Sequence, residues 1–236
     1  MKILGGGKYW ISGGDVFALA VVLLLLMIAP IARCETIILP GVACRPGWNT
    51  NLRLLGDASS TGSPWALEIK YRAVEFPGDA RTFTASIAES PAVWRYDVDD
   101  FVCREWGHLG PTSGVLIITA PFDVTGYALV SSRGFGAAVP RAVPVDPSRP
   151  IVVPEFGSID WRCNVILYVD NDRGATIMAG LGEVVLPPHE PVILHKVASG
   201  TVIWTEPNVD DQYVLVSMVN NFTGDPHNLD SWVLSP

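Results

Sequence analysis

Apolar and polar positions alternate along much of the chain. In residues 65–72 the odd-numbered positions are apolar, namely Trp65, Leu67, Ile69 and Tyr71, and the charged residues stand at even-numbered positions. A period of two indicates a half-buried β-strand. Similar runs recur at roughly ten-residue spacing between turns that contain Gly or Pro, which favours a β-sandwich. The expected strands are 36–40, 51–55, 65–72, 81–87, 92–96, 115–120, 127–132, 135–139, 151–153, 164–169, 192–195, 201–205, 213–219 and 231–234, with one or two more in 175–186, where a break is expected near Gly182.

Two phrases within this pattern occur twice. Trp48–Leu54 and Trp161–Leu167 both read Trp, any residue, a small residue, Asn, and then an alternating strand. Tyr127–Ser131 follows the first copy, and Tyr213–Ser217 follows the second with the same apolar spacing. Matched phrases in the same order indicate an internal duplication. We therefore predict an all-β chain that contains two tandem, immunoglobulin-like (Ig-like) antiparallel β-sandwich domains.

The duplication makes geometric predictions of its own. The Trp of each first phrase should occupy the same place in its own sandwich. Leu52 and Leu54 should share one face of their strand, because side chains alternate with period two. Tyr127 and Tyr213 should begin equivalent strands that line the core of each domain.

Residues 97–106 interrupt the alternation with apolar residues at helical spacing. We expect one or two helical turns there, with Asp97 as the cap and Cys103 inside. Four prolines in residues 140–150 cannot join a sheet ladder, so that segment should be stiff and extended. The predicted organisation is a leader of residues 1–34, a first sandwich domain of 36–140, a Pro-rich linker of 141–150 and a second sandwich domain of 151–236.

The N-terminal segment has the composition of an export signal. Residues 16–31 are apolar throughout, Lys2 and Lys8 precede them, and Arg33 follows. That apolar run is near the upper limit of a signal-peptide core and shorter than the roughly 20 residues of a membrane-spanning helix. We expect cleavage after Cys34, with an uncleaved anchor as the alternative. Lipidation of Cys34 is less favoured, since a large basic residue precedes it.

Charge narrows the range of partners. The chain carries 16 basic and 24 acidic residues, a net charge of −8, and contains no basic run outside the leader. Such a chain repels phosphate backbones, so nucleic-acid binding is not expected. Contact with a membrane is expected only through residues 16–31, if they are retained.

The cysteines fit an exported protein. Cys44 and Cys103 lie in the first predicted domain, and the sequence contains no Cys-x-x-Cys pair that would suggest a zinc or redox site. We predict a disulfide between them, because export supplies an oxidising setting. Cys163 takes the small-residue position of the second Trp phrase and should be a buried thiol, with an intermolecular bridge as the alternative.

Candidate catalytic and metal-binding residues give weak signals. The densest polar cluster contains Asp97, Asp99, Asp100, Glu105 and His108. A hydrolase needs two groups held at a fixed separation with pKa values pushed apart. On a short helical turn, these side chains are more readily explained as a cap and a solvated face.

Other polar motifs point to turns. His189 and His195 lack a third ligand at zinc spacing. Asp170–Asp172 lacks the ligand series of a calcium loop. Gly110–Gly114 places its Ser one position away from a nucleophile elbow. We assign no catalytic residue, cofactor or metal ligand.

The repeated phrases resemble a known group of proteins. Pro46–Leu54 and Tyr127–Pro140 resemble the first module, and Ser217–Pro226 resembles the second-module ending, of tandem β-sandwich (Ig-like) modules in secreted bacterial proteins. That ending often reads Val-Asp-Asn-x-Thr-Gly-Asp-Pro, and this chain has Asn220 where Asp is usual. In the second Trp phrase it has Cys163 where Thr is usual. The resemblance covers nearly all of residues 36–236. It implies export, a sandwich fold and a non-catalytic role, and it supplies no catalytic residues.

These observations favour an exported, non-catalytic protein that binds, adheres or scaffolds at the cell envelope or outside the cell. Its partner is expected to be a protein or polysaccharide of the cell surface. One alternative is a carbohydrate-binding module, because an exposed Trp on a sheet can stack on sugars. A hydrolase that uses the Asp97–His108 cluster is the least favoured alternative.

Overall fold

The computed structural model describes residues 35–57, 65–87, 93–121, 123–132, 135–139, 141–154, 161–220 and 226–229. All of them belong to the compact unit Arg33–Pro236. The predicted leader, residues 1–34, and the predicted strand 231–234 lie outside the described residues. In the described ranges, no helix has the length and apolarity to cross a membrane. Strands account for 63% of the structure and helices for 6%, so the all-β prediction is confirmed.

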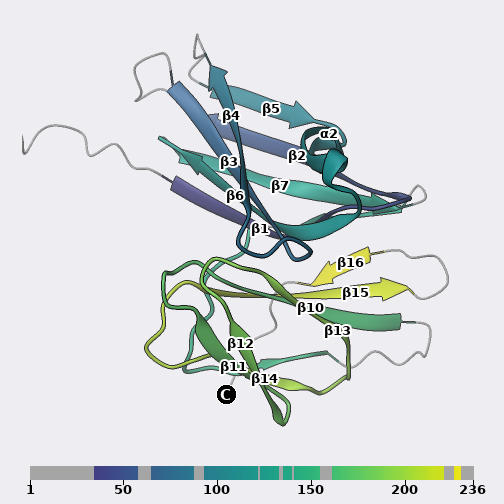
Figure 1. Ribbon diagram of the computed structural model, residues 1–236, viewed down its shortest axis with the longest axis vertical. Coiled ribbons are helices and arrows are strands. Elements are labelled where there is room, and N and C mark those ends of the chain that lie inside the picture. Colours follow the sequence, from purple (N-terminus) through teal and green to yellow (C-terminus); the bar gives the residue numbers. More distant parts are fainter. Residues whose placement is uncertain are drawn as a thin grey trace, which may run out of the picture. The chain divides into compact units, whose positions relative to one another are not determined.

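The first eight strands form two four-stranded antiparallel sheets, which we call the first sandwich (Figure 1). The sheet orders are β1-β6-β3-β4 and β5-β2-β7-β8. Their inward side chains, from both sheets, form one apolar core. The elements are β1 (Glu35–Cys44), β2 (Trp48–Asp57), β3 (Trp65–Ala73), β4 (Ala80–Ile87), β5 (Val93–Val98), α2 (Phe101–Trp106), the 3-10 helix η1 (Gly107–Leu109), β6 (Thr112–Ala120), β7 (Asp123–Ser132) and β8 (Phe135–Val139).

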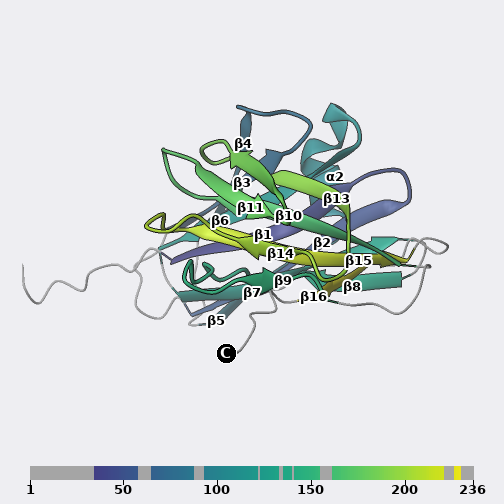
Figure 2. The same cartoon turned by 90° about the horizontal axis from the view of Figure 1, so that it is seen from below.

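The remaining strands form two further antiparallel sheets, which we call the second sandwich (Figures 1 and 2). The sheet orders are β9-β14-β11-β12 and β13-β10-β15-β16. A second apolar core lies between them. The strands are β9 (Ile151–Val152), β10 (Trp161–Val169), β11 (Ala175–Ala179), β12 (Gly182–Leu186), β13 (Val192–Val197), β14 (Val202–Trp204), β15 (Gln212–Asn220) and β16 (Pro226–Leu229).

The sheet order of the first sandwich recurs in the second with every strand number raised by eight. Strands β2 and β10 are therefore equivalent, and each begins at the Trp of its repeated phrase. In the first ladder Asn51 lies opposite Leu129, whereas in the second Asn164 lies opposite Ser217, two residues beyond Leu215. A two-residue shift preserves which side chains face the core, because side chains alternate with period two.

The strand order is not that of an immunoglobulin constant domain. In that fold the first two strands are neighbours in one sheet. Here β1 pairs with β6, and β2 lies between β5 and β7. The shared feature is the sandwich of two antiparallel sheets.

The repeated strands place alternate side chains in the core of their own sandwich. Leu52 and Leu54 on β2 are buried in the first core, and Val165 and Leu167 on β10 are buried in the second. This confirms that each pair shares one face of its strand.

The strands of the two repeated tyrosines, β7 and β15, are equivalent and line their own cores as predicted, but the tyrosines themselves do not face those cores. Tyr127 is 45% exposed, and Tyr213 belongs to the first core rather than to the core of its own sandwich. The neighbouring Ala128 on β7 and Val214 on β15 face inward instead. Both tyrosines therefore point out of their own sandwich. Tyr213 is covered by the first sandwich, whereas Tyr127 is exposed.

The outward side of the second sandwich packs against the first. Ile166 and Tyr168 on β10, with Tyr213 and Leu215 on β15, join the buried cluster of the first sandwich. Gly41 on β1 lies at this contact, since a Cβ added there would be 3.1 Å from Leu215 Cδ2. The two sandwiches thus share buried apolar surface.

The predicted linker, residues 141–150, is hydrogen-bonded to both sandwiches. Ala142 N–H donates to Ile38 O on β1 at 2.8 Å, and Val145 N–H donates to Gln212 O on β15 at 2.8 Å. These bonds fix the segment against both sandwiches, although its prolines have no N–H group to donate. The division into separate domains at this segment stays a prediction.

The predicted helical turns are present as α2, but their start differs from the expectation. Asp100 precedes α2 in a left-handed conformation with φ of 52° and makes no side-chain cap. Asp97 lies on β5 and pairs with Arg95. The helix buries Phe101 and Trp106, whose rings meet edge to face at 5.4 Å.

Candidate functional site

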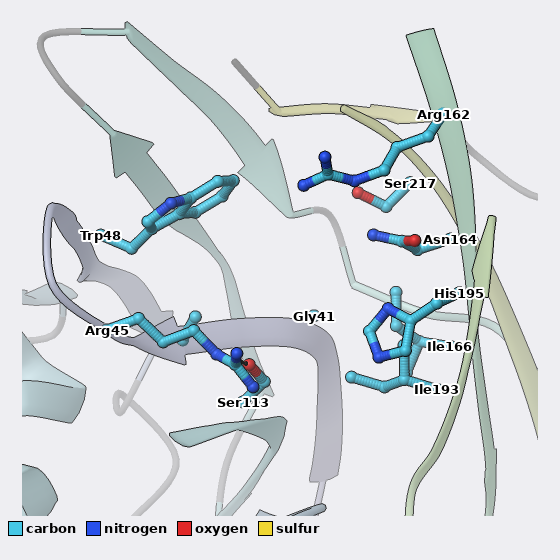
Figure 3. Close-up of a pocket in the computed structure, with 11 residues that line it drawn as sticks. Gly41, Arg45, Trp48, Ser113, Arg162, Asn164, Ile166, Ile193, His195 and Ser217 are labelled. Atoms are coloured by element: carbon cyan, nitrogen blue, oxygen red, sulfur yellow. Dashed lines mark hydrogen bonds between the residues drawn. The ribbon is translucent and has the colours of Figure 1, made fainter. Parts of the chain in front are cut away.

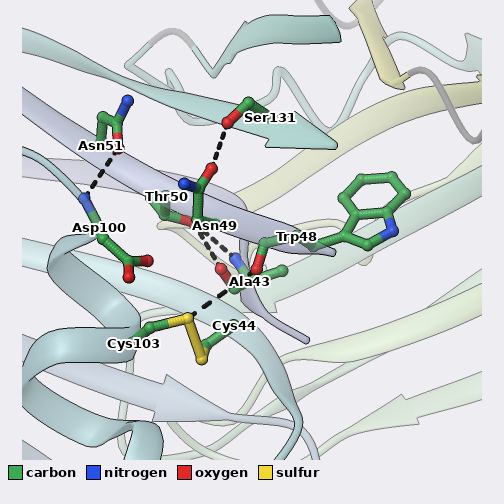
Figure 4. The surroundings of a disulfide bond; sticks show 9 residues. All are labelled: Ala43, Cys44, Trp48, Asn49, Thr50, Asn51, Asp100, Cys103 and Ser131. Carbon is green, nitrogen blue, oxygen red and sulfur yellow. Dashed lines mark hydrogen bonds between the residues drawn. A yellow bond between two sulfur atoms is a disulfide. The ribbon is translucent and has the colours of Figure 1, made fainter. Parts of the chain in front are cut away.

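The turn between β1 and β2 is tightly fixed (Figure 4). Cys44 and Cys103 are joined by a disulfide, with their Cα atoms 5.0 Å apart. Thr50 is fully buried, and its hydroxyl donates to Ala43 O at 2.7 Å and accepts from Ala43 N–H at 2.9 Å. The backbones of Arg45 and Trp48 exchange two hydrogen bonds across the turn. This framework holds the Arg45 and Trp48 side chains in position.

A pocket of about 240 Å³ opens beside this turn, between the two sandwiches. Figure 3 shows Trp48 and Arg45 on one side and Arg162, Asn164 and His195 on the other. The Arg162 guanidinium extends across the pocket toward the Trp48 indole. The lining residues that the structure describes are Gly41, Ala43, Arg45, Trp48, Ser113, Arg162, Asn164, Ile166, Ile193, His195 and Ser217.

The pocket is basic although the chain is acidic. Its lining contains Arg45, Arg162 and His195, and none of the lining residues that the structure describes is Asp or Glu, whereas the whole chain has a net charge of −8. Arg45 donates from Nε to Ser113 Oγ at 2.7 Å and forms an ion pair with Glu75. A guanidinium carries five N–H donors, so the remaining donors of Arg45 can serve a ligand. The pocket therefore favours an anionic group.

The repeated Asn is a structural residue in both sandwiches. Asn51 Oδ1 accepts from Asp100 N–H at 2.8 Å, and Asn164 Oδ1 accepts from Lys196 N–H at 3.3 Å. Both donors have a positive φ, 52° for Asp100 and 55° for Lys196. Strands β5 and β13 are equivalent, so each Asn satisfies the same backbone donor at the same irregular position. This explains why the phrase retains Asn.

The acidic cluster does not form a catalytic pair. Asp97 and Asp99 are engaged by arginine side chains, through Arg95 and Arg53 respectively. Glu105 pairs with the adjacent Arg104, and His108 is exposed on η1. Among the residues that the structure describes, no group of three or more His, Cys, Asp or Glu could hold a metal ion. The cluster is a set of surface ion pairs.

The two histidines have different surroundings. His189 lies between Asp170 and Asp172, with 2.9 Å from Nδ1 to Asp170 Oδ1 and 2.9 Å from Nε2 to Asp172 Oδ1. The hydrogen bond with Asp172 is the main cause that raises the pKa of His189, and Asp170 adds to it. Asn171 Oδ1 accepts from the following backbone N–H groups, which makes this segment the predicted turn. His195 lines the pocket.

The other predicted positions are resolved in part. Cys163 is a buried free thiol as expected, and burial raises its pKa to about 11. Trp94 and Trp106 are buried, so neither can stack on a sugar, whereas Trp204 is 46% exposed. The side chains of Trp65 and Trp161, and all of Trp232, lie outside the described parts of the chain.

Sequence reasoning missed the pocket. Arg45 precedes the Pro-Gly turn, Arg162 occupies the variable position of the second Trp phrase, and the spacing of His195 from His189 does not indicate a ligand site. Only the packing of one sandwich on the other brings these three together, so no local sequence signal could have identified them.

No protein-family profile matches the chain, and no curated protein or solved structure matches it.

Proposed function

We propose that this chain is an exported, non-catalytic protein with two tandem Ig-like sandwich modules that binds an acidic polysaccharide of the cell surface. The observation that carries the proposal is the pocket that combines Trp48 with Arg45 and Arg162 and has no carboxylate among its described lining residues. The term Ig-like refers here to the sandwich architecture, which many domains share without the same strand order.

The chemistry of the pocket suits a sugar that carries a carboxylate. An indole beside the pocket offers an apolar face on which a pyranose ring can stack. Arginine binds carboxylates through two parallel N–H···O bonds, which adds geometric specificity. Asn164 and Ser217 add neutral polar groups to the lining, where sugar hydroxyls could bind. We therefore favour uronic-acid polymers over neutral glycans.

A binding role fits better than hydrolysis. Glycoside hydrolysis generally uses two carboxyl groups on either side of the scissile bond. The part of the pocket lining that the structure describes has none, and Asp97 and Asp99 are paired with arginines elsewhere. Export is supported by the apolar segment at residues 16–31 and by a disulfide, which persists in oxidising compartments. The site of action is accordingly the cell envelope or the exterior.

Isothermal titration of the full chain in detergent, with polygalacturonate and with neutral dextran, tests this proposal. We expect binding of the acidic polymer only, and an affinity loss of about tenfold or more for Arg162→Gln, since charge-assisted hydrogen bonds are lost. Arg81→Gln removes the same charge outside the pocket and should leave affinity unchanged. Equal losses in the two variants, or equal binding of dextran, would refute a specific acidic site.

A further inference from the structure

The contact between the two sandwiches uses one outward face from each. The docking face of the second sandwich is the outward side of β10 and β15, with Ile166, Tyr168, Tyr213 and Leu215. All four are at most 8% exposed, although they point away from their own core. The apolar character of this face is therefore explained by what it covers.

The receiving face belongs to the first sandwich. Ile38 on β1 lies opposite Ile117 on β6, and Val115 shares the outward side of β6 with Ile117. These three residues are buried within the same cluster as the docking face. The receiving face is thus the outward side of β1 and β6.

Because the sheet order repeats, each sandwich has both faces, and the described residues leave one of each kind uncovered. The docking face of the first sandwich is the outward side of β2 and β7, where Leu55 is 48% and Tyr127 is 45% exposed. Leu55 aligns with the fully buried Tyr168 when the two Trp phrases are superposed, and Tyr127 aligns with the buried Tyr213.

The uncovered receiving face lies on the second sandwich. Its strands are β9 and β14, the counterparts of β1 and β6, and the outward side of β14 continues onto β11 and β12 of the same sheet. Trp204 lies opposite Met178, and the two are 46% and 37% exposed. Val185 on β12, which is 70% exposed, lies opposite Thr176 on the same side of the sheet.

We infer that a second copy of this chain covers these faces in a head-to-tail assembly. The first sandwich of one copy docks on the second sandwich of the next, and so repeats between chains the contact that already exists within each chain. A heterologous contact of this kind leaves one face of each sort open at the ends, so it generates chains of copies unless the rotation closes a ring.

Each free face presents groups that the other can contact. The free docking face contains a hollow of about 420 Å³ lined by Leu55, Tyr127 and Asp97 among others, together with Arg53 and Arg95, which form ion pairs with Asp99 and Asp97 respectively. The free receiving face presents the Trp204 indole, which an arginine can contact over its ring face. Glu183 lies opposite Met178 and therefore shares that face.

Two charge-introducing variants test the inference. Leu55→Glu alters the free docking face and Trp204→Glu alters the free receiving face, and both side chains are exposed, so neither change disturbs a core. Val143→Glu is the matched control, because Val143 is an exposed apolar residue of the 141–150 segment on neither face. Circular dichroism of each variant verifies that the fold is retained.

Sedimentation velocity of the full chain in detergent, over a range of concentrations, gives the readout. We expect the wild type and Val143→Glu to associate with increasing concentration, and each face variant to associate at least tenfold more weakly, since a charge in an apolar contact opposes association. An equimolar mixture of Leu55→Glu and Trp204→Glu should form dimers and stop there, because one intact face of each kind remains.

Three outcomes would overturn the inference. The wild type could sediment as a single protomer at every concentration that stays in solution. Both face variants could associate like the wild type, which would place the contact elsewhere, including residues 16–31. The mixture could fail to form dimers, which would exclude a contact between unlike faces. None of these outcomes bears on ligand binding in the pocket, so the two proposals fail independently.

Discussion

Replacement of Gly41 by Ala tests whether the contact between the sandwiches contributes to the stability of the fold. Gly41 has φ of +84°, and an added Cβ would lie 3.1 Å from Leu215 Cδ2 and 3.6 Å from Ile166 Cδ1. Both partners belong to the second sandwich and are nearly fully buried, so they have little room to retreat. The substitution therefore combines backbone strain with overpacking at the contact.

Gly47 provides a matched control in the same hairpin. Its φ is +81°, and an added Cβ would meet nothing within 4 Å. The left-handed conformation costs a non-glycine residue roughly 1–2 kcal/mol, and this cost should be shared by both variants. Overpacking in a well-packed core typically costs about 1–3 kcal/mol, and only Gly41→Ala should show it.

We expect Gly41→Ala to lower the free energy of unfolding by at least about 1 kcal/mol more than Gly47→Ala does. Urea unfolding followed by Trp fluorescence and by far-ultraviolet circular dichroism measures both values, and coincident transitions establish that a two-state treatment applies. Gly41→Ala should lower the free energy of unfolding by less in a Leu215→Ala background than in the wild type, because Leu215→Ala removes the atom nearest to the added Cβ. Equal destabilisation by the two glycine substitutions would refute a packed contact between the sandwiches.

Two further predictions concern the disulfide and His189. Replacing Cys44 and Cys103 together by Ser should lower the free energy of unfolding by about 4 kcal/mol, the chain-entropy value for a loop of this length; a loss below about 1 kcal/mol in urea unfolding would contradict it. Hydrogen bonds with Asp172 and Asp170 raise the folded-state pKa of His189 above its ordinary value of 6.5. The stabilisation is therefore fully present below pH 6.5 and is lost as pH rises through the folded-state pKa. It should stay below about 1 kcal/mol, because the site is partly exposed. His189→Gln should abolish this part of the pH dependence in unfolding measurements at several pH values, and an unchanged pH profile would disprove the assignment.

The sequence by itself determined the local structure and the duplication. Period-two alternation identifies strands, because only a half-buried sheet requires every second side chain to be apolar. The matched phrases identified β2 with β10 and β7 with β15, and the sheet order of the structure agrees with that pairing. The pairing of Cys44 with Cys103 was predicted because both lie in the first half of the chain. These features depend on near neighbours or on the chain's own repetition.

Only the tertiary structure decided which outward faces are covered. Tyr127 and Tyr213 occupy the same position of the same phrase, yet one is exposed and the other is buried. Both point out of their own sandwich, so alternation along the strand is the same for both. The difference arises because the first sandwich packs against β10 and β15, while no described residue of the chain covers the equivalent face of β2 and β7.

The pocket, too, arises from the packing of one sandwich on the other. Arg45 and Arg162 are more than a hundred residues apart in sequence, and neither belongs to a motif that predicts a binding site. They face each other because Gly41 lets Leu215 and Ile166 approach β1 closely, which sets the second sandwich beside the β1–β2 turn. Strand periodicity reports which side of a sheet a residue occupies, but contact between two outward faces depends on long-range packing that no local pattern encodes.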